Sequence, residues 1–288
     1  ESSITAAFAE KEDRSHPLEK AEKVGTLFFE KAGIRSLKEA RKLPGEELVR
    51  LEDVLLGPGI HFEPAIDGIL IRESNFEAYK KNHHHRIPVL AGYNRGEAES
   101  FAKAFTRPVE TMAAFREYAA GFSDKAEEFM SLCGVKNDAE VKALFSGNAM
   151  LDLAAGLRMF GYIQDSQDRK AYLYEFNADI PGEDHAGSYH GSEMWFAYDS
   201  LARCWRPFTG RHYDLARQVS SYWANFVKTG DPNGKDTIGE ELPEWKSFTA
   251  ENEFVMEFTD KPEESKVKAD ALMKFRIGYT LGREIHES

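Results

Sequence analysis

Apolar residues recur at helical spacing in three long stretches of the chain. Residues 17–33, 107–162 and 212–228 carry them three or four positions apart, which is the pattern of an amphipathic helix. Gly33 closes the first of these stretches and Gly230 lies two residues beyond the last, and glycine is a frequent residue at a helix end. The pattern therefore predicts a protein rich in helix.

Shorter helical patterns occupy three further segments, at 36–44, 46–51 and 263–276. Ser36 and Glu39 have the spacing of a capping box, in which two side chains satisfy backbone N–H groups at the start of a helix. We therefore expect a short helix to begin just after Ser36.

Three short runs have the composition of strands. Residues 87–91 form a continuous apolar run between chain-breaking residues. Residues 171–176 are rich in aromatics, and apolar and polar residues alternate over 253–258. Residues 57–86 are expected to be mostly loop. Strands separated by long helical stretches indicate an α/β fold. Three strands are few for a self-sufficient sheet, so we expect an incomplete central sheet whose other strands lie on sequence outside these 288 residues.

Composition narrows the classes of partner. Hydrophobic residues make up 42% and aromatics 12%, which is ordinary for a globular protein. The net charge of −12 argues against nucleic acid and against an anionic membrane surface as main partners, and its simplest role is solubility. No run of about eighteen apolar residues is present, so no membrane span is expected. No signal peptide is visible at the start, and the compartment is left open. The two cysteines, Cys133 and Cys204, allow either two free thiols or one disulfide, and free thiols are the expectation.

The stretch 184–195 offers a candidate catalytic base. It contains His190 between Gly187 and Gly191, shortly after the predicted strand 171–176. Histidine is the commonest general base at neutral pH, and small neighbours can expose an imidazole on a loop. His185 is a second candidate base in the same stretch. The alternative is a loop histidine that makes only ordinary hydrogen bonds.

A candidate acid lies upstream, where the predicted strand 87–91 runs into a polar loop with Glu97 and Glu99. A carboxylate just after the carboxyl end of a strand is where an α/β-hydrolase holds the acid of its triad. It would accept a hydrogen bond from the histidine and stabilise the imidazolium formed during the reaction. The carboxylate precedes the histidine in the chain, which fits the triad order of serine, acid and histidine in that fold. The alternative is a solvated acidic loop.

The nucleophile that this chemistry needs is not evident. The chain contains no Gly-x-Ser-x-Gly, the sequence of a sharp strand-to-helix turn that exposes a serine. Ser146 and Ser188 both lack the flanking glycine pattern. Two other features are expected to carry no chemistry: the adjacent histidines at 83–85, read as an exposed loop, and residues 231–234, read as a turn.

Six motifs follow one another along the chain: Pro-x-x-Asp-Gly at 64–68, the strand and acid loop at 90–97, His-Gly-x-Glu at 190–193, and late segments at 205–209, 222–233 and 242–245. Together they resemble the type B carboxylesterase and cholinesterase family in its bacterial, para-nitrobenzyl esterase-like form. One departure falls at 96–98, where Gly-Glu-Ala stands in place of the family's usual Asp-Glu-Gly.

The resemblance implies one carboxylesterase domain over 1–288, the C-terminal portion of an α/β-hydrolase fold, with substrate-gorge helices in 102–165. It implies that Glu97 is the acid and His190 the base of a Ser-His-Glu triad, and that the serine lies upstream. Glu193 is implied to be a structural, ion-pairing residue. The implied substrate is a small carboxylic ester, and no cofactor or metal is needed.

Two other hypotheses remain beside ester hydrolysis. A non-catalytic, cholinesterase-like binding or adhesion module would keep the fold and lose triad residues. A truncated product would be inactive, and its unpaired sheet edge would favour self-association. The isolated chain is expected to be inactive in either case. The acyl and alcohol parts of the ester cannot be read from the sequence.

Overall fold

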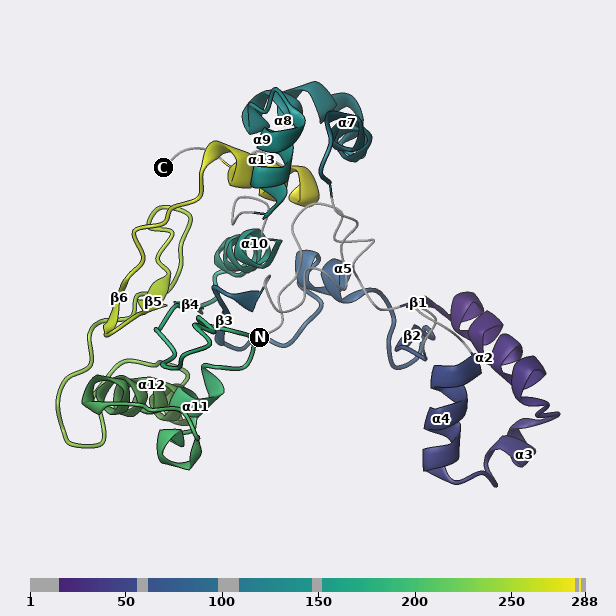
Figure 1. Ribbon diagram of the computed structural model, residues 1–288, viewed down its shortest axis with the longest axis horizontal. Helices are drawn as coiled ribbons and strands as arrows, with labels where there is room; N and C mark the ends of the chain where they lie inside the picture. Colours follow the sequence, from purple (N-terminus) through teal and green to yellow (C-terminus); the bar gives the residue numbers. More distant parts are fainter. Residues whose placement is uncertain (1–15, 56–61, 98–108, 147–151, 283–284, 286–288) are drawn as a thin grey trace. The chain divides into compact units, whose positions relative to one another are not determined.

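The computed structural model describes residues 16–55, 62–97, 109–146, 152–282 and 285 (Figure 1). The chain divides into two compact units, one within Glu10–His84 and the other within His85–Ser288.

The smaller unit is mostly helical. Its longest helix ends at Gly33, whose φ of 68° lies in the left-handed region that glycine adopts without strain. Ser36 accepts a hydrogen bond from the backbone N–H of Glu39, as its capping pattern predicts. The elements are β1 (His16–Pro17), α2 (Leu18–Ala32), α3 (Leu37–Ala40), α4 (Gly45–Leu55), β2 (Ala65–Ile66) and α5 (Asn75–Lys80), with β1 parallel to β2.

Helix α5 is a feature that the hydrophobic pattern missed, because it lies in the stretch 57–86 predicted to be mostly loop. Its six residues are too few to show a helical period. Ser74 begins the helix by accepting a hydrogen bond from the backbone N–H of Glu77. This serine cap was the available signal.

The larger unit is built around a four-stranded sheet. Its strand order is β3 (Val89–Asn94), β4 (Ala171–Phe176), β5 (Met256–Phe258) and β6 (Pro262–Glu264). The first three strands are parallel and β6 is antiparallel to β5. Within the described part of the chain, β3 is an edge strand that pairs only with β4.

Several of the predicted boundaries need correction. The strand predicted over 253–258 covers only Met256–Phe258. Strand β3 continues to Asn94, beyond the apolar run that ends at 91, because it pairs with β4 along its whole length. The predicted helix 263–276 is wrong at its start, where β6 and a loop occupy 262–270. Helix α13 (Ala271–Leu281) begins after Asp270, whose side chain accepts a hydrogen bond from the Met273 N–H.

The long helical pattern over 107–162 corresponds to several helices rather than one. Left-handed Gly134 ends one of them, with a φ of 63°. Residues 102–108 and 147–151 lie outside the described residues. The helices of this unit besides α13 are α7 (Met112–Ala120), α8 (Ala126–Cys133), α9 (Asp138–Ser146), α10 (Asp152–Ser166), α11 (Met194–Ala197) and α12 (Gly210–Thr229), with 3-10 turns η1 (Ser123–Lys125) and η3 (Leu201–Arg203).

Helices cover both faces of the four-stranded sheet (Figure 1). On one face, Tyr172 and Tyr174 of β4 share a core with α12 residues such as Tyr222. On the other face, α10 approaches so closely that a Cβ on Gly161 would lie 2.9 Å from Leu173 Cδ1. Side chains alternate between the faces of a strand, so one strand serves both layers. This is an α/β architecture with its core on either side of β4.

A second aromatic core joins α7, α8 and α13. Phe122 and Phe129 stack there, with their ring centroids 4.2 Å apart. Cys133 packs against this core, and burial raises the pKa of its thiol to about 11. Both Cys133 and Cys204 are free and half-buried. Among the helices described, none is long and apolar enough to cross a membrane.

Candidate active site

The segments that carry the candidate acid and the candidate base begin at the carboxyl ends of neighbouring strands. Strand β3 leads directly into the acid turn, residues 94–97. Strand β4 leads into the base loop, residues 177–193. The two strands run parallel, so both segments leave the same edge of the sheet. This edge is where α/β proteins hold their ligands and catalytic groups.

Glu97 and His190 meet at this edge. The Nδ1 atom of His190 lies 2.9 Å from Oε2 of Glu97, and the other carboxylate oxygen accepts a hydrogen bond of 3.1 Å from the Asn94 N–H. The Glu97 side chain is 5% exposed and that of His190 is 37% exposed. An ionised carboxylate can only accept, so it favours the imidazole tautomer with the proton on Nδ1. The Nε2 atom of that tautomer has the lone pair of a general base.

Gly96 allows the acid turn to approach the base loop. Its N–H donates a 3.0 Å hydrogen bond to the carbonyl oxygen of Ser188. A Cβ at this position would lie only 2.9 Å from the same oxygen. Glycine at position 96 therefore has a local physical reason, since a residue without a side chain fits this approach.

Arg206 anchors the base loop from its other side. Its guanidinium donates two hydrogen bonds to the carboxylate of Asp184, at 2.9 and 2.8 Å, and one of 3.0 Å to the Pro181 carbonyl. It also lies over the ring of Tyr189, 5.4 Å from the centroid. The hydrogen bond with Arg206 lowers the pKa of Asp184 below its usual value. A bidentate pair of this kind fixes both distance and orientation.

Asn94 links the acid turn to the base loop through its side chain. Its Nδ2 donates hydrogen bonds to the Tyr189 carbonyl at 2.8 Å, to Ser192 Oγ at 3.4 Å, and to the Glu193 carboxylate. Asn94 and Ser192 are fully buried, and Glu193 is 5% exposed. The last residue of β3 is thus bonded to residues on either side of His190.

A second buried carboxylate lies on the neighbouring strand. Glu175 of β4 is 1% exposed, accepts a 3.0 Å hydrogen bond from the Tyr93 hydroxyl and forms an ion pair with Arg95. Arg95 also lies 3.8 Å from Glu257 of β5. Burial, together with the charge of Glu175, raises the pKa of Tyr93 above its usual value.

The candidate residues of the sequence analysis fall in different places. Glu97 and His190 are brought together, whereas His185 is exposed. Glu99 lies outside the described residues. Glu193 accepts from the Asn94 amide. Sequence reasoning missed Asn94, because its bonds to the base loop are tertiary contacts and its only local signal is its place three residues before Glu97.

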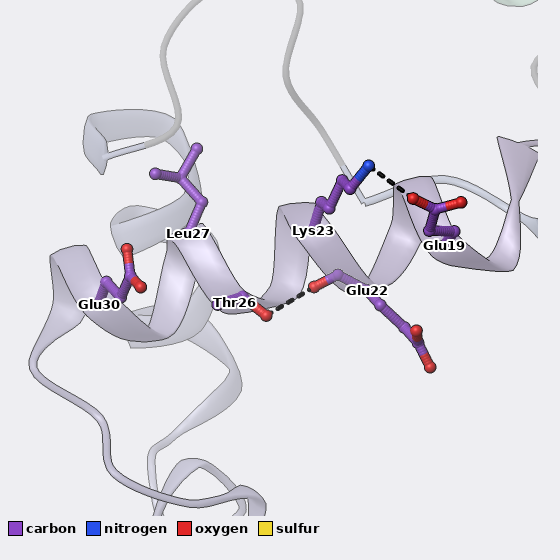
Figure 2. A pocket seen from close by; sticks show the side chains of 6 residues that line it. All are labelled: Glu19, Glu22, Lys23, Thr26, Leu27 and Glu30. Atoms are coloured by element: carbon purple, nitrogen blue, oxygen red, sulfur yellow. Dashed lines mark hydrogen bonds and ion pairs between the residues drawn. The ribbon is translucent and has the colours of Figure 1, made fainter.

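Within the described residues, two other features were candidates for a site, and neither pairs a histidine with a buried carboxylate. Figure 2 shows an open depression on helix α2, which is lined by residues of one face of that helix. Two of these residues, Lys23 and Glu19, form an ion pair of 2.7 Å. It belongs to the smaller unit, whereas Glu97 and His190 belong to the larger one. His83 contacts Glu73 at 2.6 Å. Among the described residues, no group of three or more histidine, cysteine or acidic side chains is placed to hold a metal.

The two-faced sheet, with its acid and histidine at the carboxyl edge, defines an α/β-hydrolase architecture. Solved esterases share it: a PNB esterase structure superposes with a TM-score of 0.67 at 20% identity, covering 88% of this chain and 52% of that one. A carboxylesterase of Geobacillus stearothermophilus gives a TM-score of 0.64 at 23% identity, covering 92% and 55%. The described sheet is thus a partial α/β-hydrolase sheet.

The chain belongs to the carboxylesterase family, whose sequence model matches residues 2–275. It is similar to the fumonisin B1 esterase of Sphingopyxis macrogoltabida, at 25% identity over 182 residues, which are 59% of this chain and 33% of that protein. It is 35% identical to the human cocaine esterase over 72 residues, which are 25% and 12% of the two chains. The chain spans about half the length of the solved esterases that it matches.

Proposed function

We propose that Glu97 and His190 are the acid and base of a Ser-His-Glu triad that hydrolyses carboxylic esters. The observation that carries the proposal is the 2.9 Å contact between His190 Nδ1 and Glu97 Oε2 at the carboxyl edge of a parallel sheet. Membership of the carboxylesterase family supports the reaction class. The names of the similar esterases support an ester as the substrate.

The pair would act through the Nε2 atom of His190. His190 Nε2 takes the proton of a serine hydroxyl as the serine oxygen bonds to the ester carbonyl carbon. The imidazolium then gives that proton to the departing alcohol, which leaves an acyl-serine. Water attacks the acyl carbon while His190 again accepts a proton, and His190 then returns this proton to the serine oxygen as the carboxylic acid product is released. Glu97 stays ionised throughout and stabilises the imidazolium.

The serine of this triad is proposed to lie outside the 288 residues, because the chain contains no Gly-x-Ser-x-Gly. The isolated chain would then lack ester hydrolysis. A fluorophosphonate probe, which bonds covalently to an activated serine, should leave it unlabelled. Labelling that disappears when one particular serine is replaced would show that the nucleophile is on this chain.

The function is tested with the product of the gene's full reading frame. We expect it to hydrolyse p-nitrophenyl acetate, and we expect His190→Ala to lower kcat by about 10⁵ to 10⁶, since loss of a triad base has this effect. His185→Ala is the matched control and should keep near-normal activity. Full activity of His190→Ala would overturn the proposal. A full sequence without a nucleophile elbow would favour the non-catalytic binding module instead.

The helices within 102–165 are proposed to line the ester pocket, as the family resemblance implies. Their described part includes the aromatic core of Phe115, Phe122 and Phe129, which would hold α7 and α8 firmly beside any such pocket. Small side chains on these helices would then decide ester preference. A change in the ratio of kcat/KM between acetate and hexanoate esters after substitutions there would support this, and an unchanged ratio would count against it.

Self-association of the isolated chain is a further proposal. In the described residues, one edge of β3 has no partner strand. Such edges pair readily with other chains. Light scattering should detect dimers or larger species at micromolar concentration, and a stable monomer would count against the proposal.

A further inference from the structure

We infer that Asn94 is the positioning residue that holds the acid and the base of the site in register. The inference rests on the proposed roles of Glu97 and His190. Asn94 reaches both groups at once: its backbone N–H donates to Glu97 Oε1 at 3.1 Å, and its side-chain amide donates to the Tyr189 carbonyl at 2.8 Å. Tyr189 immediately precedes His190, so one residue constrains both partners of the 2.9 Å contact.

The chemistry of the neighbours fixes which way the Asn94 amide points. A backbone carbonyl and the Glu193 carboxylate lie against one end of it, and both are acceptors when Glu193 is ionised. The NH₂ end must face them, and its two hydrogens serve these two acceptors and Ser192 Oγ. Aspartate has almost the same shape but no donor. Position 94 therefore requires an amide because the amide donates hydrogen bonds, and not because of its size.

Burial and strand pairing make Asn94 a rigid support. Its exposed fraction is 0%, and it is the last residue of β3, paired in register with Phe176 of β4. Buried hydrogen bonds are strong because water does not compete for them. A support of this rigidity matters, because a shift of about 1 Å in a catalytic group can cost about a hundredfold in rate.

The readout is the tautomer of neutral His190 in the 288-residue chain, measured by ¹⁵N NMR of the imidazole nitrogens at about pH 8.5, above the usual histidine range. The chain has nine histidines, and the signal absent from His190→Ala identifies the one required. Asn94→Ala removes the side-chain donors. Asn233→Ala is the matched control, because it also removes the hydrogen bonds of an asparagine side chain. Asn233 accepts from the Trp245 N–H at 2.7 Å and donates to the Trp245 carbonyl at 3.0 Å.

We expect wild type and Asn233→Ala to show an excess of the Nδ1–H tautomer, and Asn94→Ala to lower that tautomer ratio about tenfold, the effect of one charge-assisted hydrogen bond. A wild-type excess that persists in Asn94→Ala would overturn the inference and leave the Glu97–His190 pair standing. A wild type without the excess would overturn both.

A double variant separates positioning from folding if Asn94→Ala unfolds. Asn94→Asp places a carboxylate against that of Glu193, and adding Glu193→Gln supplies a donor that restores their hydrogen bond. The Tyr189 carbonyl still lacks its donor. Asn94→Asp/Glu193→Gln should therefore regain much of the melting temperature while its tautomer ratio stays altered relative to Glu193→Gln. A restored tautomer ratio would show that Asn94 acts only through its hydrogen bond to Glu193, and would overturn the inference.

Discussion

Two carboxylates at the same edge of the sheet are buried to a similar degree but have different partners. Glu175, near the end of β4, is bonded to the Arg95 guanidinium and the Tyr93 hydroxyl. Glu97, just after β3, is bonded to the Asn94 N–H and to His190. A guanidinium keeps its proton at any working pH, whereas an imidazole exchanges one near neutrality. The partner therefore distinguishes a carboxylate that pairs with a permanent cation from one placed to stabilise a histidine that gains a proton.

The two sites are also coupled through consecutive residues. Arg95 pairs with Glu175, and the next two residues of the chain are Gly96 and Glu97. The Arg95 N–H donates to the Phe176 carbonyl, which fixes the acid turn to β4. The structural pair thus supports the turn on which the acid lies.

Removing the charge of Glu175 should lower stability more than removing that of Glu97, whereas removing the charge of Glu97 should lower activity more. We expect Glu175→Gln to lower the free energy of unfolding by about 2–4 kcal/mol, because it leaves Arg95 without its buried partner. Glu97→Gln should lower it by about 1 kcal/mol, since the amide oxygen still accepts from Asn94. Urea unfolding of the two variants measures both values. A larger loss for Glu97→Gln would reverse the structural side of the comparison.

Gly96→Ala should disturb the Glu97 site and leave the Glu175 site intact. The new Cβ would lie 2.9 Å from the Ser188 oxygen, so the turn or the loop must shift. We expect a loss of about 1–3 kcal/mol in the free energy of unfolding.

The control is Gly25→Ala in helix α2, where a Cβ would meet nothing within 4 Å. It should stabilise the chain by up to about 1 kcal/mol, because alanine favours helix over glycine. Equal effects of the two substitutions in urea unfolding would show that the close approach at Gly96 is unimportant.

Acid should loosen the base loop through Asp184. Its pKa is lowered in the folded chain by the hydrogen bond to Arg206, so the pair contributes stability above the ordinary pKa of aspartate, and this is lost as pH falls through the lower folded value. Asp184→Asn should be less stable than wild type at pH 7, and the difference should shrink below about pH 4. Thermal melts across that range measure it. A gap that stays constant with pH would contradict this assignment.

Much of the fold could be predicted because its signals are local. Strand β4 was located at 171–176 from its aromatic composition, and the end of α12 from Gly230. The helix predicted from 263 failed because β6 is held by pairing with β5, and such pairing has no local signature. Helix α5 was missed because six residues show no period.

The site could be predicted only in part, for the same reason. Glu97 and His190 lie 93 residues apart, and motif order suggested that they meet. Glu175 lies within a run of apolar and aromatic residues, and nothing local in the sequence indicates a partner for its charge. That partner is Arg95, which follows the neighbouring strand β3. The reach of Asn94 to Tyr189 is likewise a tertiary contact.

Glu97, and not its similarly buried neighbour Glu175, is proposed to assist the histidine in catalysis. The direct measurement is kcat for p-nitrophenyl acetate with Glu97→Gln and Glu175→Gln in the product of the full reading frame. We predict a loss of about 10⁴-fold for Glu97→Gln, as for the loss of a triad acid, and a loss below about tenfold for Glu175→Gln in the folded fraction. Similar losses in the two variants, or a larger loss for Glu175→Gln, would contradict the account.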